Sequence, residues 1–230
     1  MQVYQIRLKL YMLRDIKAED ILSKIAHYID STLMQEPEFQ ALHMGKGYKN
    51  YCFDMPWPLE QDKTYRTGKI YTLTIRTVDC KLGKFFSEKL HNAYTDDVKG
   101  LTAEIKMIPR RQIEKVYSLT PVIMKSDEGY WRPNMSIADF EKRLKVNLLK
   151  KYAQLNGEKP EEDFELFSLM EFSNQNPIAC KYKQIKLLGD KLTLYIAENA
   201  VAQKLIYMAL GTGIGENNSR GYGMLNYKWL

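Results

Sequence analysis

The chain has 230 residues, of which 45% are hydrophobic and 27% charged, an ordinary composition for a globular protein that buries a core. Its 34 Lys and Arg residues exceed its 28 Asp and Glu residues and give a net charge of +6, which is compatible with a polyanionic partner. No apolar run reaches the roughly 18 residues of a membrane span, and Cys52, Cys80 and Cys180 form neither a disulfide framework nor a zinc pair, which favours a reducing cytoplasm.

The first half of the chain predicts the element order β-α-β-β-α-β. Residues 1–10 alternate, with Tyr4, Ile6, Leu8 and Leu10 on one face, which is typical of a strand and not of a signal peptide. An apolar stripe at helical spacing predicts a helix over 18–33. We expect the remaining elements to be strands at 49–54 and 69–76, a helix carrying residues 82–90, and a strand carrying residues 101–107. This order is the ferredoxin-like pattern.

The second half of the chain repeats the pattern. We expect strands at 116–124, 164–172, 178–188, 191–196 and 222–229, and helices at 136–155 and 199–210. Asn156-Gly157 stops the first helix, and Gly211 caps the second. No long Pro/Ser-rich linker divides the halves. The predicted class is therefore α+β, with tandem ferredoxin-like domains at residues 1–112 and 113–230 packed side by side.

The most specific segment is the glycine-rich loop, which we define as residues 211–223, with the sequence GTGIGENNSRGYG. A dinucleotide-binding fingerprint follows a strand and opens a helix, whereas this loop follows a helix and enters a strand. A Walker loop ends in Gly-Lys-Ser/Thr, which is absent. A flexible turn does not explain so many glycines around one arginine. Glycines let backbone N–H groups approach phosphates, and Arg220 supplies charge or a bidentate contact.

The pattern G-x-G-x-G-E-x-N-S-x-G-x-G before the last strand resembles the signature of the CRISPR-associated repeat-RNA endoribonucleases of the RAMP superfamily. The doubled ferredoxin-like pattern is similar to that family over essentially the whole chain. The segments 118–122 (SLTPV) and 130–133 (YWRP) fit the start of its second domain. The resemblance implies that the chain binds a CRISPR precursor RNA and cuts once within each repeat, without a cofactor, releasing guide RNA for an interference complex.

The chain has three histidines, His27, His43 and His91, and histidine is the usual proton-transfer residue near neutral pH. His43 lies in a glycine-containing connection between the first helix and the next strand, where loops commonly carry chemistry. His27 lies beside the apolar stripe of the first helix, which favours a structural role. His91 lies near the end of the second helix, where it can interact with the helix dipole.

The family resemblance implies a catalytic set of Tyr28, His43 and Lys49, which match the order of a tyrosine in the first helix, a histidine in the next loop and a lysine soon after. The implied reaction is attack by a ribose 2′-hydroxyl on its own phosphorus, giving a 2′,3′-cyclic phosphate and a 5′-hydroxyl. We assign His43 as the general acid, Tyr28 to the nucleophile side and Lys49 to charge stabilisation. The acid and base directions of Tyr28 and His43 can be exchanged, and Lys46 competes with Lys49.

We expect the RNA to be bound by the glycine-rich loop and by a groove that joins it to a basic pair at the domain junction. The predicted RNA-binding residues are Gly211, Gly213, Gly215, Asn218, Ser219, Arg220, Gly221, Gly223, Arg110 and Arg111. No metal site is expected, because the acidic clusters at 96–97 and 161–163 lie in polar stretches without a histidine partner.

Two other classes of protein remain open. The first is a repeat-RNA-binding subunit that keeps the fold and the loop but no longer cleaves. The second is a ferredoxin-like small-molecule enzyme or metal-binding protein, which needs a ligand cluster that the chain does not show. The sequence leaves open a monomer or a homodimer, and it does not specify the repeat or its cleavage position.

Overall fold

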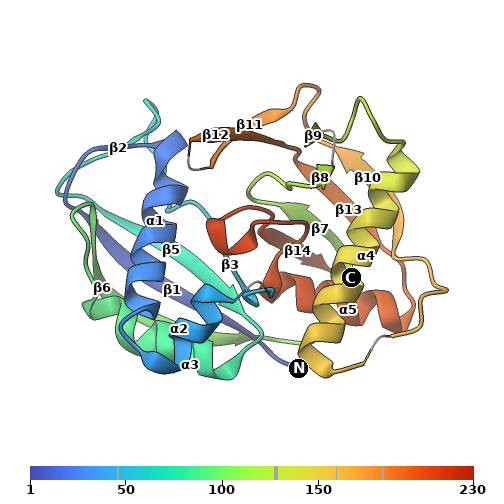
Figure 1. The fold of residues 1–230 in the computed structure, drawn as a ribbon, viewed down its shortest axis with the longest axis horizontal. Helices are drawn as coiled ribbons and strands as arrows, with labels where there is room; N and C mark the ends of the chain where they lie inside the picture. The colour runs from blue at the N-terminus through green and yellow to red at the C-terminus, as the bar shows by residue number, and fades with distance from the viewer. Residues whose placement is uncertain (46, 127–128, 159, 183) are drawn as a thin grey trace.

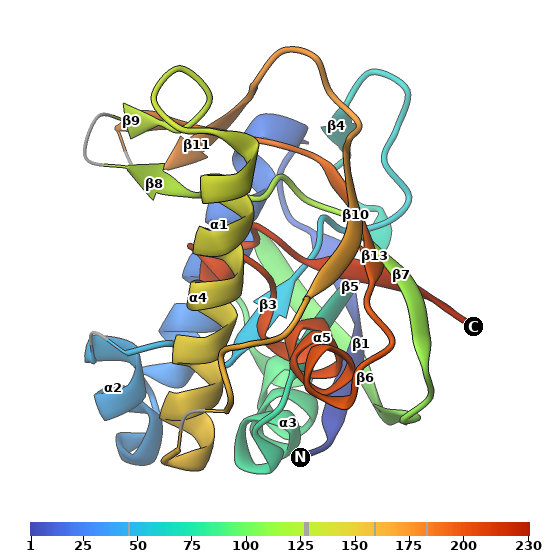
Figure 2. The ribbon, with the colours of Figure 1, turned by 90° about the vertical axis from the view of Figure 1, so that its right-hand side faces the viewer.

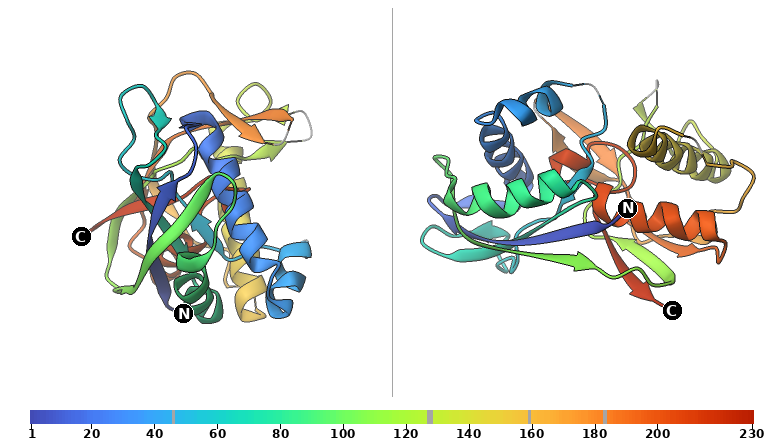
Figure 3. Two further views of the ribbon diagram at one scale, coloured as in Figure 1. Left: turned by 90° about the vertical axis from the view of Figure 1, so that its left-hand side faces the viewer. Right: turned by 90° about the horizontal axis from the view of Figure 1, so that it is seen from below.

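The computed structural model describes residues 1–45, 47–126, 129–158, 160–182 and 184–230, except for the side chain of His43. Within these residues, two four-stranded antiparallel sheets form, one from each half of the chain. Both sheets lie along one side of the molecule and the main helices on the other (Figure 1 and Figure 3, right). This is a tandem ferredoxin-like arrangement, as the sequence predicted.

The first sheet has the strand order β3-β5-β1-β6. Its strands are β1 (Val3–Met12), β3 (Tyr51–Phe53), β5 (Ile70–Thr77) and β6 (Val98–Ile108). The alternation of β1 buries Ile6, Leu8 and Leu10 under the helices. The first half also contains α1 (Ala18–Leu33), α2 (Pro37–Met44), α3 (Cys80–Lys89), η1 (Leu90–Asn92), β2 (Ile16–Lys17) and β4 (Thr64–Tyr65). The helix predicted at 18–33 is confirmed at both ends.

The second sheet has the order β10-β13-β7-β14, so each sheet places its second, third, first and fourth main strand side by side. The elements of this unit are β7 (Ile113–Ser118), α4 (Ile137–Asn156), β10 (Phe167–Phe172), β13 (Leu192–Ile196), α5 (Ala200–Thr212), η2 (Asn218–Arg220) and β14 (Leu225–Trp229). Ser136 caps α4 by accepting the Asp139 N–H, and Gly157 ends it at a φ of 76°, as predicted.

Two short hairpins, β8 (Lys125–Ser126) with β9 (Gly129–Tyr130) and β11 (Ile178–Tyr182) with β12 (Ile185–Gly189), lie outside the main sheets at one end of the molecule (Figure 2). β11 contacts α1 of the first half. The two cores therefore interleave: the first contains Ile123, Cys180 and Tyr222 from the second half, and the second contains Val3 from the first strand.

Several predicted bounds were wrong for physical reasons. The strand expected at 116–124 ends at Ser118, and Pro121, which has no N–H to donate to a sheet, follows it. Residues 178–188 form a hairpin instead of one strand. Helix α5 continues through Gly211, where a Cβ would lie 2.8 Å from Val78, and Gly213, at a φ of 74°, caps it instead.

Candidate functional site

Two segments far apart in the sequence line one pocket. The glycine-rich loop lies between α1 and α4 (Figure 1), and its residues, including Glu216, Ser219 and Arg220, share a cavity of about 350 Å³ with Gly45 and residues 47–51. β3 follows this connector directly and contacts η2, which brings the two segments together. We call this cavity the loop pocket. It brings together Lys49 and Arg220, although they lie 171 positions apart in the sequence.

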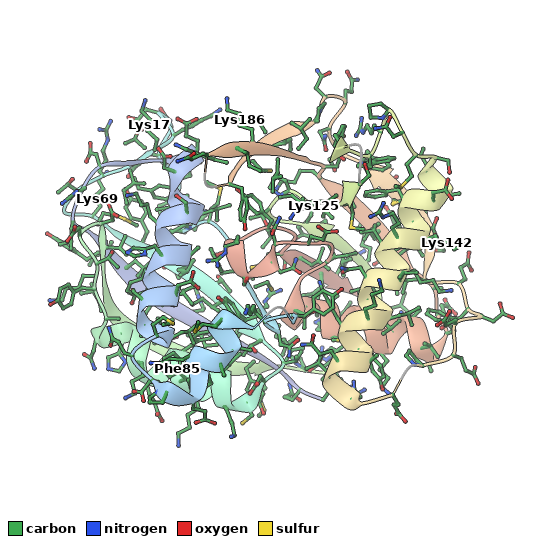
Figure 4. All side chains as sticks on the ribbon, viewed as in Figure 1. Lys17, Lys69, Phe85, Lys125, Lys142 and Lys186 are labelled. Carbon is green, nitrogen blue, oxygen red and sulfur yellow. The ribbon has the colours of Figure 1, made fainter. Side chains whose placement is uncertain are left out.

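The loop pocket is predominantly positive. Among its described lining residues, Lys49, Lys151 and Arg220 are cationic and Glu216 is anionic. The Glu216 carboxylate also has a cation of its own, because the ammonium of Lys125 lies 3.9 Å from it; Figure 4 labels this lysine beside the loop, whereas Lys142 lies on the outer side of α4. A cavity of this composition suits a phosphodiester, since closely spaced cations in a partly desolvated site favour an anion.

Lys49 closes the end of α2. Its ammonium donates to the carbonyl oxygens of Leu42 and of Gly45, the latter at 2.6 Å, which are acceptors that a helix end leaves unpaired. Burial and the neighbouring Arg220 guanidinium lower the pKa of Lys49, and the Asp30 carboxylate acts in the opposite direction. Lys49 therefore fixes the turn next to His43 and contributes charge to the loop pocket.

Arg220 is held by an ion pair with Asp30 on α1. The Arg220 side chain is one-third exposed, whereas that of Asp30 is 17% exposed, so the pair is anchored from the protein side while the guanidinium still lines the pocket. The pair places Arg220 at a defined position instead of leaving it on a mobile loop. A guanidinium held in this way is suited to a directed contact with a phosphate oxygen.

The glycines of the loop have a packing role that the sequence did not predict. Gly213, Gly215, Gly221 and Gly223 all have positive φ, and a Cβ at Gly223 would lie 2.0 Å from the carbonyl oxygen of Ile214. The N–H of Gly223 donates to Pro121, and that of Gly221 to Asn218. These glycines are thus required for a tightly packed loop, and the N–H groups of Gly221 and Gly223 already have acceptors inside the protein.

Lys151 on α4 is a site residue that sequence reasoning missed. Only 1% of its surface is exposed, and its ammonium donates to Gly213 O (2.8 Å), Gly215 O (3.0 Å) and Asn218 Oδ1 (2.6 Å). Burial lowers its pKa to about 7. A signal was present in the sequence: Leu144, Leu148 and Lys151 recur at helical spacing, so this lysine falls on the buried stripe.

His43, the predicted acid, lies in α2, one residue before the end of that helix. The sequence placed it in a loop, which is wrong for its backbone: Pro37 begins an additional helix inside the connector. The side chain of His43 and the whole of Lys46 lie outside the described residues. The structure therefore places His43 two residues before Gly45, the first residue of the loop pocket in the chain, and does not test its role.

Tyr28 does not extend its hydroxyl outward as expected. Its surface exposure is 0%, its hydroxyl donates to the Leu90 carbonyl, and burial raises its pKa. Helix α1 turns this side chain into the first core, on the side of Gly100. The structure does not bring Tyr28 to the loop pocket, where the tyrosines among the described lining residues are Tyr48, Tyr51 and Tyr182.

Arg110 and Arg111 lie elsewhere. They line a separate cavity with Gln203, Lys204 and Tyr207 of α5, and the Arg110 guanidinium lies 5.6 Å from the centroid of the Tyr207 ring. This cavity has no described lining residue in common with the loop pocket. Helix α5 contributes its first half to this cavity and Thr212, at its end, to the loop pocket, and the expected groove between Arg110, Arg111 and the loop stays a prediction.

His27 is closer to the site than the sequence suggested. It is exposed and lines a cavity of about 300 Å³ with Asp30, Tyr182 and Arg220. Tyr182 and Arg220 also line the loop pocket, so the two cavities adjoin. His91, in contrast, bonds within its own segment, with its Nδ1 3.0 Å from the Ser87 carbonyl oxygen.

Within the described part of the chain, no group of three or more His, Cys, Asp or Glu side chains has an arrangement that could hold a metal ion. None of the helices that the structure describes has both the length and the apolar composition of a membrane span.

Comparisons with known proteins agree with one another. The family model described as "CRISPR associated protein Cas6, C-terminal" matches residues 104–227. The CRISPR-associated endoribonuclease Cas6 2 of Methanocaldococcus jannaschii is 22% identical over 213 residues, which are 85% of this chain and 87% of that protein. A solved structure of a CRISPR associated protein Cas6 has a TM-score of 0.74 at 20% identity and covers 98% of this chain and 99% of its own. A RAMP protein described as binding different RNA substrates has a TM-score of 0.73 at 17% identity with the same coverage.

Proposed function

Because the chain belongs to the CRISPR-associated Cas6 family, whose C-terminal model matches more than half of it, we propose that it is an endoribonuclease that cuts CRISPR precursor RNA within the repeats. The observation that carries this proposal is the loop pocket, in which the connector after His43 and the glycine-rich loop meet around Lys49, Lys151 and Arg220. The scissile phosphodiester binds there, and the repeat RNA is the partner.

The proposed reaction is an internal transesterification. The ribose 2′-hydroxyl gives its proton to a base on the nucleophile side and forms a bond to the adjacent phosphorus, while the bond from phosphorus to the 5′-oxygen breaks. The products are a 2′,3′-cyclic phosphate and a 5′-hydroxyl. His43 donates a proton to the leaving 5′-oxygen, and Lys49 and Arg220 stabilise the negative charge that develops on the phosphoryl oxygens. No metal ion takes part in this scheme.

The nucleophile side of the reaction has less support. The family resemblance places Tyr28 there, but its hydroxyl is buried and bonded to Leu90, and its raised pKa makes it a poorer base than an exposed tyrosine. Its catalytic role stays a prediction without support from the geometry. Arg110 and Arg111 likewise stay predicted RNA contacts, in a position separated from the loop pocket.

In this proposal both halves of the chain contribute residues to the site. Residues 1–112 supply His43 and Lys49, and residues 113–230 supply the glycine-rich loop with Arg220. The released guide RNA passes to an interference complex in the cytoplasm. The protein acts as a monomer or a homodimer.

The test is cleavage of the repeat RNA from the protein's own CRISPR array in the presence of EDTA. We expect a discrete product with a cyclic phosphate, and a rate for His43→Ala that is lower by roughly 10²–10⁴-fold. His91→Ala is the matched control, because this histidine bonds within its own segment, and it should cleave at the wild-type rate. Full activity of His43→Ala would refute the assignment, and cleavage that requires added Mg²⁺ would refute the metal-free scheme.

The same assay separates the enzyme from a non-catalytic repeat-RNA-binding subunit of the same fold. Tight binding of the repeat without any cut product would favour the subunit. The loop pocket serves either function, whereas the presence of a histidine two residues before Gly45 of that pocket supports the enzyme.

A further inference from the structure

A buried ammonium lies directly under the glycine-rich loop. Lys151 is 1% exposed, yet this residue of α4 is among those that line the loop pocket. It contacts three acceptors, Gly213 O, Gly215 O and Asn218 Oδ1, at 2.6–3.0 Å. Asn218 in turn donates its amide to Ile214 O and Tyr222 O, both at 2.9 Å, so one cation holds both arms of the loop.

The number of acceptors around Lys151 indicates that this lysine is protonated when the glycine-rich loop has the observed shape. Three acceptors require three N–H donors, which an ammonium has and a neutral amine does not. Loss of the proton removes one of these three hydrogen bonds inside the protein, which is costly. Burial acts in the other direction and lowers the pKa of Lys151 to about 7. The loop geometry and the protonation of one side chain are therefore coupled.

We propose that Lys151 is a positioning residue whose buried ammonium holds the glycine-rich loop in the shape that binds a phosphodiester, so that RNA binding and protonation of this lysine favour each other. This inference rests on the proposed function, because it assumes that the loop pocket receives an RNA phosphate. Lys151 has almost no exposed surface and acts through the loop carbonyls, without forming a reacting group.

The charges around Lys151 come from several elements. Glu216 of the loop favours the ammonium, whereas burial raises the pKa of the Cys52 thiol of β3 to about 12, so that thiol stays neutral and adds no charge. The Tyr48 ring centroid lies 5.7 Å from the Lys151 nitrogen. Lys49 and Arg220 line the same pocket and disfavour a further positive charge. A bound phosphate offsets this repulsion, so RNA raises the proton affinity of Lys151.

The first experiment compares Lys151→Met with Lys150→Met, a control that removes one charge from the exposed neighbour on the same helix. The probe is the repeat RNA with 2′-O-methyl groups at every ribose, which cannot be cleaved through the 2′-hydroxyl. We expect Lys151→Met to raise the Kd at pH 7 by at least about tenfold and Lys150→Met to raise it by no more than the loss of one surface charge does. Urea unfolding of both variants shows whether each is folded.

The second experiment measures proton uptake on RNA binding, which a purely structural role of Lys151 would not produce. Wild-type protein should take up a proton when it binds the probe at pH 8, measured by calorimetry in two buffers of different ionisation enthalpy. Its affinity should fall as pH rises above 7, by at most about tenfold per pH unit for one linked proton. Lys151→Met should lose both effects. If it fails to fold, His27→Ala/His43→Ala protein takes its place and should still take up a proton, because Lys151 is a source of uptake that needs no imidazole.

The outcomes are distinct. Equal affinity and equal proton uptake in Lys151→Met and wild type would overturn the inference and leave the proposed function intact. Loss of uptake in the protein without His27 and His43 would also overturn it. A wild-type protein that does not bind the probe at any pH would refute the proposed function, and the inference with it.

Discussion

Substitution of Gly223 by alanine tests whether the glycine-rich loop is built for its own packing. Gly223 and Gly157 both have positive φ, at 67° and 76°, which costs an alanine roughly 1–2 kcal/mol at either position. Their surroundings differ. A Cβ at Gly223 would lie 2.0 Å from the Ile214 carbonyl oxygen, whereas a Cβ at Gly157 meets nothing within 4 Å.

The clash at Gly223 forces the loop to move and strains three hydrogen bonds. These are Gly223 N–H to Pro121, Ile214 N–H to Gly223 and the Asn218 amide to Ile214, each at 2.9 Å. At about 1 kcal/mol each, their loss adds to the backbone strain. We therefore expect Gly223→Ala to lower the free energy of unfolding by about 4–5 kcal/mol, against about 1–2 kcal/mol for the control Gly157→Ala.

Equilibrium unfolding in urea measures both variants, with the slope m checked against wild type. Equal losses of stability at the two positions would refute this reasoning. A Gly223→Ala protein that is as stable as Gly157→Ala but binds RNA poorly would show that the glycine serves close approach to phosphate, as the sequence alone suggested.

Three further predictions concern charges. Arg220→Ala should reduce the magnitude of the slope of log K for RNA binding against log salt by about 0.7. A rise from 50 to 200 mM salt then weakens RNA binding about 2.6-fold less than in wild type. Arg220→Lys should keep the slope, and an unchanged slope in Arg220→Ala would rule out a phosphate contact. Asp190 has no exposed surface and accepts hydrogen bonds from Trp131 and Arg132, each at 2.7 Å, so thermal unfolding of Asp190→Ala should show a loss of about 3–5 kcal/mol, with the exposed Asp163→Ala near wild type. Burial raises the pKa of Asp54 to about 6 from 3.8; the folded state then binds more protons than the unfolded state between these values, and stability should fall by about 3 kcal/mol as pH rises through that window. Asp54→Asn should remove this fall, and an unchanged pH profile would contradict it.

The sequence predicted most accurately those features that depend on residues close together in the chain. Helix α1 was predicted with both ends correct, since an apolar stripe and its flanking residues lie within one segment. The stop of α4 at Gly157 also follows from a single residue at positive φ. Lys49 and Arg220 were predicted separately, for charge stabilisation and for RNA binding, and both line the loop pocket; their roles stay predictions.

Features that depend on distant partners were not predictable. Val122 and Ile123 look like strand residues, but they leave the sheet to pair with Asp190 and Glu216. Lys151 looks like one of many surface lysines until Gly213 and Asn218 are placed against it. Arg110 and Arg111 form a basic pair in the sequence, yet their cavity has no described lining residue in common with the loop pocket. The positive charge of a side chain did not predict which cavity that side chain lines.

Because the two cores interleave, each half of the molecule stabilises the other. Ile123, Cys180 and Tyr222 complete the first core, and Val3 completes the second, so a fragment severed between β6 and β7 would expose apolar surface on both pieces. The two halves should therefore unfold in one cooperative transition. A destabilising substitution near the C-terminus should also destabilise the first core and the connector that carries His43.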